Sequence, residues 1–245
     1  MDLNLKEKCA LVFGSSMGIG RGIAEVLIRE GASVGLLARH AAELEKVKSE
    51  IGAKAAYEAD LTKPGVARDT VQKFIRDFGR LDILVTNTGG PARGGFLDVP
   101  EKQWQDDFQS LWMSVVEALN EALPAMKKQK FGRVIMITSL AAVEPIAGLT
   151  TSNGFRAGLT GLCKSISNEV ASFGITVNTI RPGYINTRRI QENKWSPEKI
   201  REMVPAGRLG EPQELGELAA FLASEKAAYI TGQSIAVDGG RLRGH

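Results

Sequence analysis

The chain has 245 residues, of which 43% are hydrophobic and 24% are charged, and its net charge at pH 7 is +3. This size suits one α/β domain with a large core or two small domains, and a charge so small and dispersed argues against nucleic acid or a membrane as a partner. Two histidines and two cysteines argue against a histidine-based triad or a metal site, and without a membrane-length apolar run or a signal-peptide pattern we expect a cytoplasmic protein.

The first predicted strand, residues 9–13, runs into a glycine-rich turn and then into a helix that begins near Gly18. Glycines stand at positions 14, 18 and 20. Glycine lets a backbone approach a pyrophosphate, whose charge the following helix N-terminus stabilises. A plain tight turn is the alternative, but a strand and a helix flank this one as a dinucleotide site requires. Cys9 and Cys163 lie in apolar segments, so we expect two buried, reduced thiols.

The second predicted strand, residues 33–38, ends in Ala38 and is followed by Arg39. In dinucleotide-binding folds, the residue at this strand end meets the adenosine ribose. A carboxylate there favours a free 2′-hydroxyl, whereas an arginine favours a 2′-phosphate. The sequence therefore favours NADP over NAD, although a solvated loop arginine is the plain alternative.

The middle of the chain continues to alternate strands and helices. We expect Thr62 and Pro64 to start the helix that runs to residue 78, and we expect Pro124 to break or kink the helical segment 104–126. The other predicted elements are a helix at 43–51, strands at 55–59, 83–85 and 134–138, and an irregular loop at 89–100.

A long amphipathic helix, residues 152–173, occupies the next part of the chain, and Gly174 ends it. A strand at 175–180 follows, then a charged helical stretch at 188–203, which is either a mobile lid or a solvated surface helix. A helix at 212–223 and a strand at 234–237 complete the pattern. With no linker or repeat, residues 1–245 are predicted to form one domain.

This alternation predicts a doubly wound, Rossmann-type parallel sheet of about seven strands, with helices on both faces. In such a sheet, ligands bind where the carboxyl ends of the strands meet. Five residues fall at predicted strand ends and are expected to share one site: Gly14, Arg39, Asp60, Asn87 and Ser139.

Several spaced motifs resemble those of the short-chain dehydrogenase/reductase family, and most of all its 3-oxoacyl-acyl-carrier-protein reductase group. Residues 14–20 (GSSMGIG) resemble the glycine motif, residues 86–89 (TNTG) resemble the Asn-Asn-Ala-Gly motif with two substitutions, and Pro182, Gly183 and Thr187 resemble the Pro-Gly-x-x-x-Thr motif. Residues 207–212 and 229–240 resemble the C-terminal signature. The resemblance covers nearly the whole chain.

The resemblance implies a nicotinamide cofactor, NADP or alternatively NAD, and a homotetramer or homodimer. The residues it places at the cofactor, with Arg39 from the strand argument above, are Gly14, Ser16, Met17, Gly18, Ile19, Gly20, Arg39, Asp60, Leu61, Asn87, Gly89, Arg156, Pro182, Gly183, Ile185 and Thr187. Phe13 stands where the family usually has a threonine, and Phe13 and Thr86 together erode the expected pocket.

The family's catalytic Asn, Ser, Tyr and Lys correspond here to Leu111, Ser139, Ser152 and Arg156. The register rests on residues 156–159 (RAGL), which resemble the family's Lys-Ala-Gly-Leu, and on the spacing back to Ser139. Only the serine at 139 is kept. The resemblance therefore implies a departure from the family's usual proton chemistry.

Carbonyl reduction needs a proton for the developing alkoxide as well as a hydride. Ser152 is a far weaker acid than a tyrosine, and Arg156 keeps the charge of a lysine but does not shuttle protons. Tyr184 follows Pro182-Gly183 in the loop expected at the nicotinamide, so we expect Tyr184, Ser139 and Arg156 to polarise the substrate carbonyl. A tyrosine that only packs on the cofactor or the lid is the alternative.

Two functions are compatible with these residues. The first is an NAD(P)-dependent oxidoreductase that reduces a carbonyl, of 3-oxoacyl type or another ketone, or oxidises an alcohol by a non-standard mechanism. The second is a catalytically inactive nucleotide-binding sensor or companion subunit. In the first case the partner is a small-molecule substrate, whose identity the sequence does not encode in a readable motif.

Overall fold

The computed structural model describes residues 2–91 and 93–244. Within these residues, seven parallel strands form one sheet in the order β3-β2-β1-β4-β5-β6-β7. The strands are β1 (Cys9–Phe13), β2 (Ser33–Ala38), β3 (Ala55–Glu58), β4 (Ile83–Thr86), β5 (Gly132–Ile137), β6 (Ile175–Pro182) and β7 (Ser234–Val237). The order reverses between β1 and β4, which pair in parallel. A doubly wound sheet opens a crevice at such a reversal, so the predicted fold class is confirmed.

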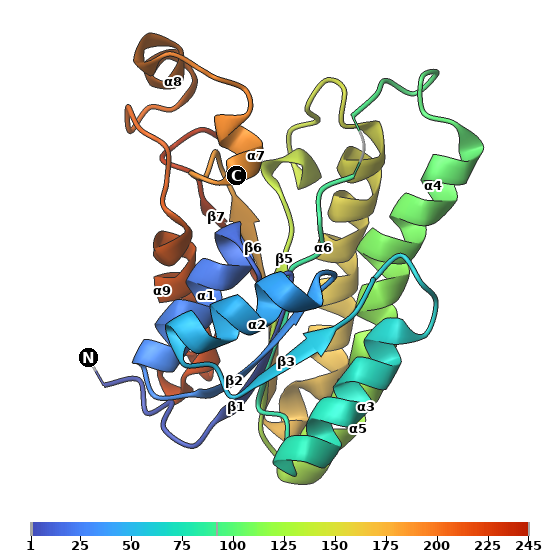
Figure 1. The fold of residues 1–245 in the computed structure, drawn as a ribbon, viewed down its shortest axis with the longest axis vertical. Coiled ribbons are helices and arrows are strands. Elements are labelled where there is room, and N and C mark those ends of the chain that lie inside the picture. The colour runs from blue at the N-terminus through green and yellow to red at the C-terminus, as the bar shows by residue number, and fades with distance from the viewer. Residues whose placement is uncertain (1, 92, 245) are drawn as a thin grey trace.

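Helices cover both faces of this sheet (Figure 1). The α-helices are α1 (Gly18–Arg29), α2 (Ala41–Ile51), α3 (Val66–Phe78), α4 (Glu101–Phe108), α5 (Ser114–Gln129), α6 (Thr150–Val170), α7 (Arg188–Gln191), α8 (Pro197–Met203) and α9 (Pro212–Ala223). Helices α1, α2 and α9 contribute to one buried apolar cluster, and α3, α5 and α6 contribute to a second one. Among the described residues, no helix is long and apolar enough to cross a membrane.

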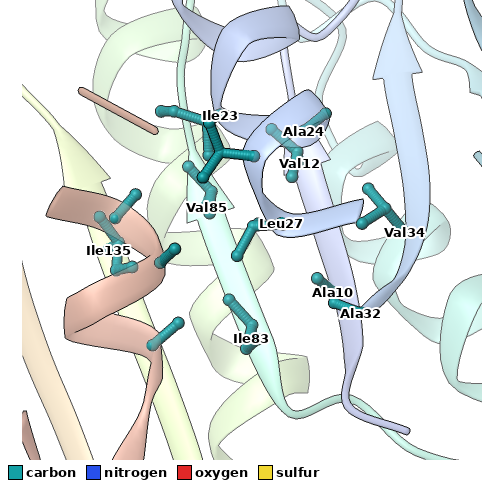
Figure 2. Packing of buried hydrophobic residues seen from close by; sticks show 14 of the residues in the cluster. Ala10, Val12, Ile23, Ala24, Leu27, Ala32, Val34, Ile83, Val85 and Ile135 are labelled. Atoms are coloured by element: carbon teal, nitrogen blue, oxygen red, sulfur yellow. The ribbon is translucent and has the colours of Figure 1, made fainter. Parts of the chain in front are cut away.

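The first apolar cluster joins α1 to the middle of the sheet. Ile23, Ala24 and Leu27 are fully buried against strand residues that include Val12 and Val85 (Figure 2). Their spacing is that of one helical face, which explains why this segment folds as an amphipathic helix over alternating strand positions. The packing fixes the start of α1, and with it the glycine-rich turn, at the carboxyl end of β1.

A buried carboxylate fastens β1 to β4 at the opposite end of the strands. Asp82 is fully buried and accepts a hydrogen bond from the Cys9 backbone N–H at 2.8 Å. Its other contacts are with Arg80, whose Nε and Nη2 donate at 2.8 and 2.7 Å. A buried carboxylate needs such partners to offset its lost hydration. Asp82 therefore holds together the two strands that flank the crevice.

Three local predictions differ from the structure. The segment 104–126 is interrupted at a π-helical turn, Gln109–Met113, and Pro124 does not break the helix but lies inside α5. Helix α3 begins after Gly65, whose positive φ of 82° suits glycine, and Thr62 instead donates to Asp60 at 2.8 Å. The stretch 188–203 forms two short helices, α7 and α8, rather than one.

The predictions for the cysteines and the long helix hold with small adjustments. Cys9 and Cys163 are buried free thiols. Helix α6 begins two residues before the predicted start, and its last turn, Ala171–Phe173, is a 3₁₀ helix that ends at Gly174 with a φ of +73°. Such tightening of a last turn is common, because it satisfies the final carbonyl groups.

Candidate active site

A cavity of about 760 Å³ opens at the carboxyl ends of β1, β2 and β4, where the strand order reverses. The predicted cofactor residues that line it are Gly14, Ser16, Met17, Gly18, Ile19, Arg39, Asp60, Leu61, Asn87, Gly89 and Thr187. A pocket at this place in a doubly wound sheet is where a dinucleotide is expected. The structure therefore brings predicted residues from five separate segments into one cavity.

The glycine-rich turn is packed so closely that side chains are excluded. Gly14 has a φ of +59°, and a Cβ at this position would lie 2.5 Å from the Asn87 carbonyl oxygen. A Cβ at Gly20 would lie 2.2 Å from the Gly14 carbonyl oxygen, which explains why Gly20 itself does not line the cavity. The Asn87 amide donates to the Gly14 carbonyl at 3.3 Å. These contacts hold the turn against the end of β4.

Two charged residues stand at the β2 and β3 end of the cavity. Arg39 is exposed and forms no ion pair among the described residues. Burial of Asp60 acts to raise its pKa, but hydrogen bonds from the Thr62 backbone and hydroxyl, helped by the charge of Arg39, hold that pKa below its ordinary value. Arg39 thus lies near Asp60 and carries an unneutralised guanidinium.

The residues at the predicted catalytic positions come from three segments: the end of β5, helix α6 and the π-helical turn. Ser139 follows this strand, and its Oγ accepts from the Ala141 N–H at 3.1 Å. Ser152 and Arg156 are one turn apart on α6, and each is only 5% exposed. Leu111 is fully buried in the π-helical turn.

Arg156 points into the protein rather than into the cavity. Its guanidinium donates to the carbonyl oxygens of Ile137, Thr88 and Gly89. Burial, together with the charge of Arg189, lowers its pKa to about 10. A guanidinium with this pKa is still protonated at neutral pH, so Arg156 is a fixed buried cation. Arg156 does not line the large cavity, and its contact with the cofactor ribose stays a prediction.

Tyr184 does not line the large cavity. It lines a neighbouring hollow of about 180 Å³ together with Leu140, the residue that follows Ser139. Its ring also packs edge-on against Trp195, with 5.0 Å between the ring centroids. Pro182, Gly183 and Ile185, predicted at the cofactor, are likewise absent from the lining of the large cavity. In Gly183, a Cβ would meet the Asp238 Cα at 2.6 Å, so this glycine serves close backbone packing.

Sequence reasoning missed several residues of the cavity wall. Asp107 on α4 is 4% exposed, accepts from the Thr151 hydroxyl at 2.7 Å and from the Gln103 amide at 2.8 Å, and lines the cavity. Thr88 lines it as well. The helical spacing of Gln103 and Asp107 was a visible signal, but a polar pair on a helix is usually a solvated face.

Comparisons with known proteins bear on this site. A family model described as enoyl-(acyl carrier protein) reductase matches residues 14–241. The chain is 37% identical over 242 residues to the 3-oxoacyl-[acyl-carrier-protein] reductase FabG of Escherichia coli strain K12, covering 97% of this chain and 98% of that protein. In Shigella flexneri, a protein of the same name gives the same values.

Solved structures are also similar to this chain over nearly its whole length. The NADPH-dependent reductase YwfH, involved in bacilysin biosynthesis, superposes with a TM-score of 0.93 at 33% identity, covering 98% of this chain and 100% of that one. The L-sorbose reductase of Gluconobacter frateurii, complexed with NADPH and L-sorbose, superposes with a TM-score of 0.93 at 30% identity over 100% of both chains.

Proposed function

The chain belongs to the short-chain dehydrogenase/reductase family and is an NAD(P)-dependent oxidoreductase, and we propose that it uses NADPH to reduce the carbonyl group of a small molecule. One observation carries the proposal. The cavity at the strand reversal offers a free arginine, Arg39, where an NAD-binding protein of this fold commonly offers a carboxylate. The NADPH-bound sorbose reductase supports the choice of cofactor.

The residues of the cavity fit a dinucleotide phosphate. A Cβ added at Gly89 would meet no atom within 4 Å, so the wall there is open to a ligand. The amino end of α1 lies at the glycine-rich turn and favours a pyrophosphate. We assign Arg39 to the 2′-phosphate, Asp60 and Leu61 to the adenine side, and Asn87 and Thr187 to the nicotinamide side. Bound there, NADPH would supply the hydride.

The chain must then stabilise the charge that develops on the substrate oxygen. Ser139 has a hydroxyl whose proton is not donated to another described residue, so it is available to that oxygen. Tyr184 shares a hollow with the residue next to Ser139, and we assign to it the proton transfer that Ser152 is too weak an acid to perform. Arg156 contributes a buried positive charge behind the site.

The proposal also covers the oligomeric state and the cellular compartment of the protein. Phe96, Trp104, Phe155 and Phe108 form a chain of ring contacts across α4 and α6, with centroids 5.7–5.9 Å apart. Phe96 is 70% exposed in the isolated chain. A partly exposed aromatic surface supports burial in a homodimer or homotetramer. Two free, buried thiols support a reducing, cytoplasmic setting.

The test is a fluorescence titration of the purified protein with NADPH and with NADH, followed by a carbonyl screen that records NADPH oxidation. We expect NADPH to bind at least about tenfold more tightly than NADH, as one good charge-assisted contact allows. Binding of neither cofactor would overturn the proposal. Tight binding without turnover of any carbonyl would favour the inactive nucleotide-binding protein instead.

A further inference from the structure

Three arginines from three different segments lie near enough to act on one another electrostatically, and one of them, Arg189, lines the large cavity. Arg156 comes from α6, Arg189 from α7 and Arg93 from the loop after β4. Among the described residues, none of the three forms an ion pair. Glu192, the carboxylate that acts on Arg189 electrostatically, pairs with Arg188 at 3.5 Å. The cluster therefore carries excess positive charge.

The Arg189 side chain is held at the cavity wall by one long hydrogen bond to a neutral group. Its Nη2 donates to the Pro91 carbonyl at 3.3 Å, and its guanidinium lies where a Cβ of Gly90 would be, 1.2 Å from that position. Burial lowers the pKa of Arg189, and so does the charge of Arg93. Arg93 itself donates to the Asn193 side-chain oxygen at 3.0 Å. Both arginines are thus satisfied only by neutral oxygens.

Two buried polar atoms beside the cluster lack partners. The Nε of Arg156 and the Oγ1 of Thr88 have no hydrogen-bond partner among the described residues. Thr88 is 6% exposed and lines the cavity, and its carbonyl accepts from Arg156 at 3.3 Å. Unpaired donors and like charges cost stability when they are withdrawn from water. An anion bound in the cavity would offset the like charge, and it would accept a hydrogen bond from the Thr88 hydroxyl.

We propose that Arg189, backed by Arg156 and Thr88, binds a carboxylate of the substrate, so that the enzyme acts on oxo acids in their free, anionic form. This inference rests on the proposed reductase function and names its substrate class. Arg156, which follows Ser152 by one turn of α6, joins the cluster to Ile137 at the end of β5, two residues before Ser139. Arg39, which is assigned to the cofactor's phosphate, lies at the end of β2 instead. A carboxylate held by Arg189 would lie in the large cavity, which Thr88 also lines.

The experiment compares acetoacetate with methyl acetoacetate, which differ in charge but share the reacting ketone. Calorimetric titrations of both probes are made on the protein alone and on the protein saturated with NADP⁺. We expect acetoacetate to bind the wild-type protein and the ester to bind about 10- to 100-fold more weakly, because the ester lacks the charge-assisted hydrogen bonds. In Arg189→Gln, acetoacetate is expected to lose about the same factor and the ester nothing.

Arg201→Gln is the matched control, since Arg201 on α8 pairs with Glu198 and does not line the cavity. It removes the same charge and should leave both affinities unchanged. Circular dichroism and the melting temperature confirm that each variant folds. Failure of the wild-type protein to bind acetoacetate, or equal binding of acid and ester, would overturn the proposal.

A parallel NADPH titration of Arg189→Gln separates the two anions that an arginine here can meet. If NADPH affinity falls and acetoacetate affinity does not, Arg189 serves the cofactor's phosphates and the substrate proposal is wrong. The acetoacetate titration of the protein alone measures binding at the carboxylate site in the absence of cofactor. If the wild-type protein fails to bind NADPH, the reductase assignment is wrong. The acetoacetate titration of the protein alone still tests the carboxylate site directly.

Discussion

Arg39→Gln is expected to separate the two nicotinamide cofactors. Arg39 is exposed, lines the cavity at the end of β2 and has no ion pair among the described residues, so its charge is free for a phosphate. A hydrogen bond to a charged group is worth about 1.5–3 kcal/mol, and exposure to water places this one at about 1.5–2 kcal/mol. The Kd for NADPH should therefore rise about 10- to 30-fold, whereas that for NADH should change less than about twofold.

Fluorescence titration at low and high salt measures this effect. The difference between wild-type protein and Arg39→Gln should shrink at high salt, because ions screen an exposed pair. A second readout does not involve the cofactor: the charge of Arg39 lowers the pKa of Asp60, so that pKa should rise in the variant. An unchanged Kd for NADPH, or an equal loss for NADH, would refute the assignment.

Three further substitutions test other parts of the structure. Tyr184→Phe should lower kcat about 100-fold or more and leave the Kd for NADPH unchanged, because it removes a proton donor and not a cofactor contact; unaltered turnover would remove Tyr184 from the mechanism. Asp82→Ala should reduce the free energy of unfolding, measured in urea, by about 2–3 kcal/mol, because a fully buried carboxylate and its two hydrogen bonds from Arg80 are lost. Arg80 is 45% exposed, so its guanidinium is hydrated in the variant. A loss below about 1 kcal/mol would contradict the proposed joining of β1 and β4. In the folded protein, the Arg208 side chain and the Glu211 backbone N–H lower the pKa of Glu214 from 4.5 to about 2. The stabilisation from Glu214 is therefore complete above pH 4.5 and is lost as the pH falls toward 2. Glu214→Gln should cost less than about 1 kcal/mol at pH 7 and nothing near pH 2, measured by thermal unfolding, and an equal cost at both pH values would contradict the linkage.

The fold could be predicted from the sequence because strand and helix periods alternate with glycines at the turns. Gly14 and Gly174 have positive φ values, so the chain reversals that they mark were visible in the sequence. The π-helical turn was not visible, because Pro124 is the stronger local signal and yet is tolerated inside α5. Whether the helix is interrupted at the π-helical turn or at Pro124 depends on how the folded helix packs.

The candidate site was predictable at the strand ends and at the motifs that resemble those of the family. Gly14, Arg39 and Asn87 follow strands directly, and all three line the cavity. The direction of Arg156 was not predictable, because the carbonyl groups that it meets belong to β5 and to the loop after β4, both distant in sequence. Arg189 was visible only as one charge in a charged segment, since its lack of a carboxylate partner is a tertiary property.

The burial of Leu111, Ser152 and Arg156 has a consequence for any attempt to restore the family's usual residues. Leu111 is fully enclosed, and the other two are each 5% exposed. An asparagine at 111 would leave an amide among apolar neighbours, and a tyrosine at 152 would need space that the present packing does not leave. A lysine at 156 would give up the fork of bonds that Arg156 makes to three carbonyl groups. A single reversion at any of the three positions should therefore give a less stable protein.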